Sequence, residues 1–147
     1  MKKIILILVI AFSSSQVFPQ ADYDKIVNDF FETYKTDKDK AFDKIFETNK
    51  WLSENKKGKI SVKTTIHHDV LQLGEYFGYE EMITTKLGKS LVLKSFILKY
   101  ERQPIRFTFI FYKANDHWIL YDFNYDDNLN NEIFDKARDE FLNPNKK

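Results

Sequence analysis

Residues 90–126 read SLVLKSFILKYERQPIRFTFIFYKANDHWILYDFNYD, and this stretch decides the fold. Apolar and β-branched residues fill three runs, and the polar runs between them, at residues 101–104 and 113–116, carry turn-forming residues. The alternation is strictest at residues 106–112, where Phe107, Phe109 and Phe111 fall on one side of a strand. We therefore predict an antiparallel meander of three strands, preceded by a fourth strand at residues 79–87.

One face of this meander, called the inner face below, is predicted to be almost wholly apolar. The last hairpin is expected to close with Lys113 opposite Asp116. Phe107 then lies opposite Asp122, and directly opposite residues share a face. The preceding hairpin is expected to close at residues 101 and 104. With these registers the inner face carries Glu81, Ile83, Val92, Lys94, Phe96, Leu98, Tyr100, Phe107, Phe109, Phe111, Trp118, Leu120, Asp122 and Asn124.

The opposite face, called the outer face, is predicted to be apolar as well. It would carry Leu91, Leu93, Ile97, Thr108, Ile110, Tyr112, Ile119, Tyr121 and Phe123, with Lys99 and Arg106 toward one end. A single antiparallel sheet usually shows water a more polar side, and a contiguous apolar surface usually marks a contact with a partner. We therefore predict a homodimer whose contact surface consists of Thr108, Ile110, Tyr112, Ile119 and Tyr121.

The first 21 residues are predicted to be a signal peptide. Lys2 and Lys3 precede an apolar run at residues 4–12 that is too short to span a bilayer, and small residues follow at 13–16. A buried first strand or a membrane anchor is the alternative interpretation of the same residues. Cleavage between residues 16 and 22 would give an exported protein, periplasmic or extracellular, with no membrane span in the mature chain.

Residues 22–147 are long enough for one core and are predicted to form a single domain. The chain contains no cysteine, so neither disulfides nor thiolate chemistry can contribute. Once Lys2 and Lys3 leave with the leader, 21 basic and 22 acidic residues remain. This balance gives no basic footprint for nucleic acid, and we expect no nucleic-acid partner.

Helices are predicted before and after the meander in the sequence. Apolar residues recur with helical spacing at residues 22–35, 39–48 and 129–141. A third N-terminal helix is expected at residues 59–73 and ended by Gly74, although β-branched residues leave a strand at 59–66 as the alternative.

Three smaller features complete this part of the chain. Asp37 or Asp39 is expected to cap the second helix. Trp51 and Leu52 are expected to fix the following turn to the core, and residues 55–58 are expected to form a solvated loop.

This order of elements resembles the nuclear transport factor 2-like superfamily. The resemblance lies in YDKIVNDFFETYKTDKDKAFDKIF at residues 23–46 and in the closing hairpin KANDHWILYDFNYD at residues 113–126. Residues 78–129 also look like small exported bacterial proteins of unassigned function. The resemblance implies an α+β domain in which N-terminal helices pack on a curved, cone-shaped antiparallel sheet, followed by a short C-terminal helix. The same cone hosts ketosteroid isomerase, scytalone dehydratase and polyketide cyclases. Neither the catalytic residues of ketosteroid isomerase nor the histidine and aspartate pairing of scytalone dehydratase has a counterpart here.

The candidate chemistry lies on the inner face, which would line the cone. A carboxylate there, at Asp122, would be desolvated and could act as a general acid or base beside Tyr100. The remaining pocket lining would be Leu98, Phe107, Phe109, Leu120, Asn124 and Lys94. The alternative is that Asp122 lies near the exposed end of its strand or is a satisfied polar group.

No cofactor or metal is expected. His67 and His68 are adjacent, so their side chains diverge by about 100° on a helix, and His117 falls on the other face of the sheet. A zinc site needs three or four converging ligands.

Three functions remain open at this point. The first is an exported, non-catalytic binding or interaction module that dimerises through the outer face and holds a small apolar ligand in the cone. The second is a lyase or isomerase of the cyclase type that transfers a proton through Asp122. The third is a structural subunit of the cell envelope, with a filled cone and a wide apolar outer face.

Overall fold

The computed structural model describes residues 22–144, so the predicted signal peptide at residues 1–21 lies outside the described residues. The elements in chain order are α1 (Asp22–Tyr34), α2 (Lys38–Glu47), α3 (Lys50–Glu54), α4 (Lys56–Leu71), β1 (Tyr76–Leu87), β2 (Leu91–Tyr100), β3 (Ile105–Tyr112), β4 (Ile119–Asp126) and α5 (Leu129–Leu142). Within this range no helix is both long and apolar enough to cross a membrane.

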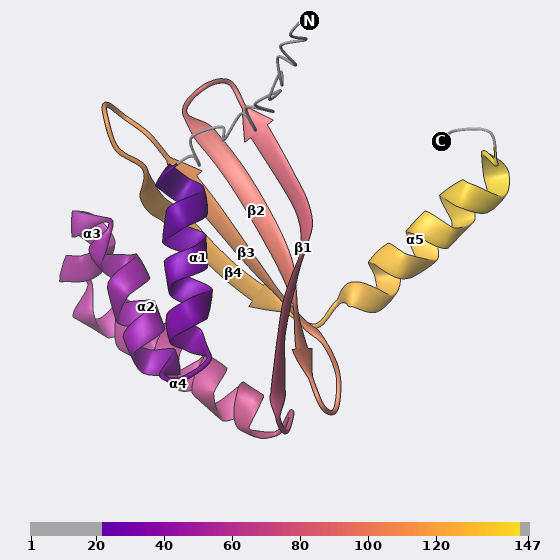
Figure 1. The fold of residues 1–147 in the computed structure, drawn as a ribbon, viewed down its shortest axis with the longest axis horizontal. Helices are drawn as coiled ribbons and strands as arrows, with labels where there is room; N and C mark the ends of the chain where they lie inside the picture. Colours follow the sequence, from indigo (N-terminus) through magenta and orange to yellow (C-terminus); the bar gives the residue numbers. More distant parts are fainter. Residues whose placement is uncertain (1–21, 145–147) are drawn as a thin grey trace, which may run out of the picture.

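The strands form one antiparallel sheet in the order β1-β2-β3-β4. Figure 1 shows α1 to α4 gathered on one side of the strands, while α5 stands away from the body on the other side. The predicted α+β class, with helices followed by a four-stranded antiparallel sheet and a C-terminal helix, is thus confirmed, but the short helix α3 is not predicted.

The helices begin and end at residues that the sequence marks for this role. The side chain of Asp37 accepts a hydrogen bond from the backbone nitrogen of Lys40 and caps α2, as predicted. Gly74, just past α4, has a φ of +78°, the left-handed conformation that glycine adopts without a steric penalty. Because residues 59–66 lie within α4, the alternative of a strand there is wrong.

Two predictions about the segment between α2 and α4 are wrong. Residues 56–58 belong to α4, because the Asn55 side chain accepts a hydrogen bond from the backbone nitrogen of Gly58 and starts the helix. Trp51 is 76% exposed and does not fix the turn to the core, whereas Leu52 packs partly against it.

The core lies between α1, α2 and the inner face of the sheet. Phe107, Phe109 and Phe111 are each 0% exposed, so the predicted alternation in β3 is confirmed. The ring of Phe30 on α1 lies 5.1 Å from that of Phe109, and Phe31 lies 5.0 Å from Phe96. Burial of these rings is the main stabilising contribution, at roughly 1.5–3 kcal/mol for each large apolar side chain.

The hairpin between β2 and β3 keeps the predicted faces but not the predicted register. Phe96 pairs with Phe107, whereas the predicted register pairs it with Phe109. The last pair before the turn is Leu98 with Ile105, not residue 101 with residue 104. A shift of two residues leaves every side chain on its face.

Strand β1 is irregular. The pairing with β2 shifts between Glu81 and Ile83, so Glu81 faces inward as predicted, whereas Ile83 pairs with Ser95 and is 52% exposed. A second shift lies between Tyr76 and Gly78. The prediction that Ile83 faces inward is therefore wrong, because a bulge changes the face of the residues that follow it.

Strand β4 contains the most consequential departure from the predicted register. Phe111 pairs with Leu120 and Ile110 with Asp122, so Tyr121 is an extra residue in β4. Beyond this bulge the faces are exchanged: Phe123 points inward, and Asp122 and Asn124 lie on the outer face. The phenylalanine is favoured there because its ring meets those of Phe42, Phe107 and Phe109 at 5.3, 5.1 and 5.2 Å.

Candidate functional site

The inner face, where the sequence predicts a ligand pocket, is filled by side chains. Leu98, Phe107, Phe109 and Leu120 are each 0% exposed, and rings from α1 and α2 pack directly on them. Lys94 also faces inward, but Asn124 is exposed on the outer face, so its predicted place in the lining is wrong.

Tyr100 belongs to a cluster of three tyrosines in the core. Its hydroxyl lies 2.8 Å from that of Tyr34, and the Tyr76 ring lies 5.4 Å from Tyr34 and 5.3 Å from Tyr100. Burial raises the pKa of Tyr100 to about 12, although the hydrogen bond with Tyr34 works in the opposite direction. Burial likewise raises the pKa of Tyr34. The Tyr34 and Tyr100 hydroxyls therefore stay protonated at neutral pH and bond each other, whereas the buried Tyr76 hydroxyl has no hydrogen-bond partner among the described residues.

Asp122 and Tyr100 are not brought together. Asp122 is half-buried on the edge strand β4, where it pairs with the outer-face residue Ile110 and accepts a hydrogen bond from the Asn124 side chain at 3.0 Å. It lines a hollow of about 170 Å³ beside α3 and α4, together with Leu52 and Val62. The geometry that proton transfer through this pair requires is absent from the described residues.

Lys94 is the buried charge of the inner face. Its side chain is 9% exposed, and its ammonium group bonds Asp24, in the first turn of α1, and Glu81 of β1 at 3.0 Å. Burial opposes the charged form, but the bonds to the two carboxylates outweigh it and raise the pKa of Lys94. The pKa of Glu81 is lowered by the Thr84 hydroxyl and then by Lys94. The cluster fixes the start of α1 on the sheet.

Protein groups surround the Lys94 ammonium group, so its burial and charge are explained without a bound ligand. The ammonium group also lies 5.9 Å from the centre of the Tyr23 ring and 5.7 Å from that of Phe96, so aromatic faces complete its surroundings. Lys94 was expected on this face, but Asp24 was not expected as its partner, because 70 residues separate the two.

Two polar residues after α2 hold the edge of the sheet at Leu120. The Thr48 hydroxyl accepts a hydrogen bond from the Leu120 backbone nitrogen at 3.0 Å, and the Asn49 side chain donates to the Leu120 carbonyl at 2.8 Å. Asn49 is 6% exposed and also caps α3. The sequence does not predict either contact, because a threonine and an asparagine after a helix indicate only a helix cap and not a contact with a distant strand.

The histidines do not form a metal site. His67 and His68 line a surface hollow of about 390 Å³ with Lys63 and Leu71, and His68 lies 3.2 Å from the neighbouring carboxylate of Asp69. Among residues 22–144, no group of three histidine, aspartate or glutamate side chains is placed to hold a metal ion.

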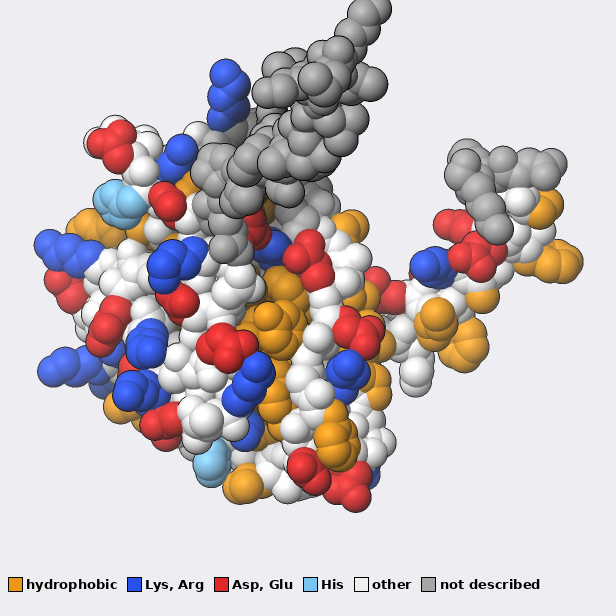
Figure 2. All heavy atoms as spheres, viewed as in Figure 1, with side chains coloured by type: hydrophobic (Ala, Val, Ile, Leu, Met, Phe, Trp, Pro, Cys, Tyr) orange, Lys and Arg blue, Asp and Glu red, His pale blue; other side chains and the backbone are white. Residues whose placement is uncertain are grey.

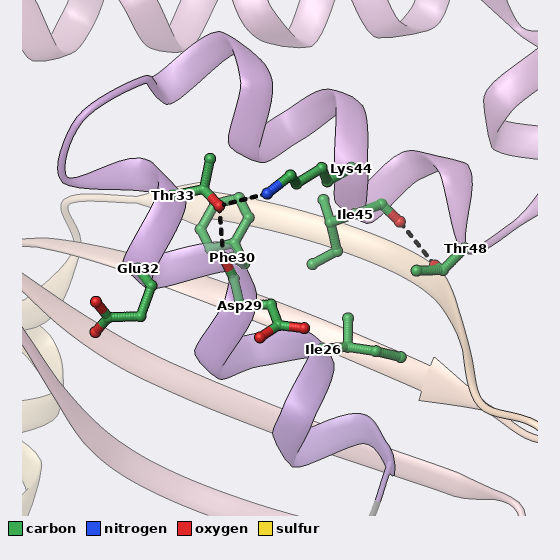
Figure 3. Close-up of a pocket in the computed structure, with 8 residues that line it drawn as sticks. All are labelled: Ile26, Asp29, Phe30, Glu32, Thr33, Lys44, Ile45 and Thr48. Atoms are coloured by element: carbon green, nitrogen blue, oxygen red, sulfur yellow. Dashed lines mark hydrogen bonds between the residues drawn. The ribbon is translucent and has the colours of Figure 1, made fainter.

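A larger hollow of about 480 Å³ lies between α1 and α2 (Figure 3). Ile26 and Ile45 contribute its apolar part, and the Lys44 ammonium donates to the Thr33 hydroxyl at 3.1 Å. The carboxylates at its rim are already paired, Asp29 with Lys25 and Glu32 with Lys35. This hollow is therefore an open groove between two helices whose rim carboxylates already have lysine partners.

The outer face is not covered by any helix of the described chain (Figure 1). Within the predicted dimer surface, Tyr112 is 39% and Tyr121 is 59% exposed, and their rings lie 6.4 Å apart. Thr108, Ile110 and Ile119 of the same surface are half-buried. With the corrected register the outer face consists of Ile83, Thr85, Leu87, Leu91, Leu93, Ser95, Ile97, Thr108, Ile110, Tyr112, Ile119, Tyr121, Asp122 and Asn124, with Lys99, Arg106 and Asp126 at one end.

Helix α5 carries a second uncovered apolar surface, called the α5 stripe, which consists of Leu129, Ile133, Phe134, Ala137 and Phe141. None of these residues is buried: Ile133 is 59%, Phe134 67% and Phe141 84% exposed. Figure 2 shows hydrophobic side chains standing out along this helix. A lone amphipathic helix of 14 residues is only marginally stable in water, so its apolar side needs a partner surface.

Comparisons of the chain with protein-family models, with curated proteins and with solved structures found no match. The resemblance to the nuclear transport factor 2-like superfamily therefore stays a prediction from the residues quoted above.

Proposed function

We propose that this chain is an exported, non-catalytic interaction module of the nuclear transport factor 2-like type that pairs with a second copy through the outer face of its sheet. The order of helices and strands and the packing of the helices on one face support the fold assignment. The basic and apolar pattern of residues 1–16 supports export.

One observation carries the proposal: the outer face has apolar residues on all four strands, with polar residues among them, and no helix of residues 22–144 covers it. Leu87, at the end of β1, is 73% exposed, and Tyr121 on β4 is 59% exposed. Between them lie the half-buried Leu93 and Ile110 of the two central strands. Exposed apolar surface that is contiguous over several strands is typical of a protein contact.

The packed inner face supports an interaction role over catalysis. Rings occupy the space where a ligand of the cone would bind, and Asp122 lies on the opposite face from Tyr100. The proposal therefore contains no ligand in the cone.

Sedimentation velocity of the chain expressed from Met1 tests the pairing. We expect a dimer at micromolar concentration and a monomer for Ile110→Lys, because a charge would be buried in the centre of the contact. The matched control is Ile60→Lys on α4, where the side chain is already 65% exposed and away from the sheet; it should remain a dimer.

The intact mass of the same purified protein tests export. A chain that begins between residues 17 and 22 is expected in the exported fraction. A wild-type monomer at this concentration contradicts the pairing, and a chain that retains Met1 in the cytoplasm contradicts export.

A further inference from the structure

Two uncovered apolar surfaces of similar length exist in one chain. Helix α5 has 14 residues and so is about 21 Å long, and the eight residues of β3 span about 26 Å. A helix laid along β3 would therefore cover most of the length of this strand and the side chains of its neighbours beside it. Pairing of two bare sheets would hide the sheets only and would leave the α5 stripe in water.

The start of α5 is held in a direction that leads away from its own sheet. Arg106, on the outer face, donates two hydrogen bonds to Asp126 at 2.9 and 3.0 Å and also bonds Glu132 in the first turn of α5. The backbone nitrogen of Asn128 donates to Asp126, and only residues 127 and 128 separate β4 from the helix. With these contacts in place the helix projects from the body (Figure 1), and the α5 stripe does not reach its own outer face.

From this geometry we infer that α5 of each chain lies across the outer face of a second copy, so that two chains exchange their C-terminal helices. The inference rests on the proposed pairing through the outer face and names the element that covers it. A two-fold axis would make the two contacts identical, as in most closed dimers.

The area available in the chain itself is enough for such a dimer. At about 200 Å² for each aromatic side chain, the exposed parts of Phe134 and Phe141 come to roughly 300 Å², and those of Tyr112 and Tyr121 to roughly 200 Å². Two copies would hide roughly 1,000 Å² of aromatic surface alone, and the aliphatic neighbours bring the total into the range of about 1,200–2,000 Å² that stable interfaces bury. No third protein is needed to cover either surface.

Cysteine pairs test the exchange directly, because the chain has no cysteine of its own. One chain carries Ala137→Cys on the α5 stripe, and a second chain, marked by a tag of different mass, carries a cysteine on the outer face. Leu93→Cys, Ile110→Cys and Tyr121→Cys are tried in turn, so that one position on each of three strands is sampled. After mild oxidation we expect a disulfide between the two different chains.

The matched control is Asp135→Cys, which lies on the opposite side of α5 from Ile133 and Ala137 and should give no such bond. Double variants with both cysteines in one chain distinguish exchange from a helix that folds onto its own sheet. A disulfide within one chain in these variants overturns the inference. So does the absence of any bond between α5 and the sheet at all three positions.

A second measurement separates this inference from the proposed function. Phe134→Asp together with Phe141→Asp is expected to weaken dimerisation by roughly tenfold or more, because both aromatic residues would lie in the contact. If this variant dimerises as wild type does while Ile110→Lys is monomeric, the helix exchange is wrong and the outer-face dimer stands. If the wild-type chain is itself a monomer, both are wrong.

Discussion

At the scale of single residues, Lys94 contrasts with Asp122. Both are charged residues predicted for the inner face, but only Lys94 lies there, with Asp24 and Glu81 as partners. Asp122 bonds the neighbouring side chain of Asn124 at the edge of the sheet. A buried ammonium group with two carboxylates contributes to stability, whereas a surface carboxylate contributes little.

We predict that Lys94→Met lowers the free energy of unfolding by about 1–2 kcal/mol at pH 7, as measured by urea unfolding. Methionine has a side chain of similar length but makes neither the bonds to the two carboxylates nor the ammonium contacts with the Tyr23 and Phe96 rings, so the loss reports the charge. Asp122→Asn, the matched control, should change stability by less than about 0.5 kcal/mol. Equal losses for the two variants would contradict the assignment of Lys94 as the structural charge.

The difference in the free energy of unfolding between the wild-type chain and Lys94→Met should depend on pH. The pKa of Lys94 is raised, so its contribution is present below the ordinary lysine value of about 10.4 and is lost as the pH rises through the higher folded value. The pKa of Glu81 is lowered, so its contribution is present above about 4.3 and is lost as the pH falls through the lower folded value. The difference between wild type and Lys94→Met should therefore be largest between these limits and shrink on both sides.

At the scale of the elements, the turn between α2 and α3 stabilises the sheet as well as the helices. Asn49 caps α3 and donates to the Leu120 carbonyl, whereas Asn55 only caps α4. The first of these two caps thus joins a helix end to the edge of β4.

We predict that Asn49→Ala lowers the free energy of unfolding by about 2 kcal/mol, because it removes a cap and leaves the Leu120 carbonyl without this donor. Asn55→Ala should cost about 1 kcal/mol as a cap alone. The difference between the two variants in urea unfolding measures the contact with β4. If the two losses are equal, Asn49 acts only as a cap.

The elements also show what the sequence could predict. The alternation in β3, the Asp37 cap and the conformation of Gly74 depend on neighbours a few residues away, and local patterns indicate them correctly. Local patterns do not indicate the bulge at Tyr121, because it depends on the packing of the Phe123 ring against Phe42 and Phe107, which are distant in the sequence.

The candidate site failed at the same point. One extra residue in β4 places Asp122 and Asn124 away from the inner face. Rings of α1 and α2 fill the space beside the other predicted lining residues. The contact of Lys94 with Asp24 joins residues 70 apart, and such partners cannot be assigned from spacing.

At the scale of the whole molecule, the described chain has one well-packed layer of helices and one bare sheet face. Helix α5 buries none of its residues, so it adds little to the stability of a single chain. Stability and association are therefore expected to depend on each other.

We predict that the midpoint of thermal unfolding rises with protein concentration for the wild-type chain, because a dimer is stabilised by mass action. The midpoint for Ile110→Lys should be independent of concentration. Scanning calorimetry over a hundredfold range of concentration measures both. A wild-type midpoint that does not move would contradict a dimer linked to folding.

The edges of the sheet limit the kind of assembly that this surface can build. At Leu120 both backbone groups of β4 are taken by Thr48 and Asn49, and β1 departs from regular pairing at two places. Both features hinder the addition of a foreign strand, which is how sheets grow into fibrils. If the proposed contact through the outer face forms, each chain has one such face, so pairing of two chains occupies both faces and the assembly stops at a dimer.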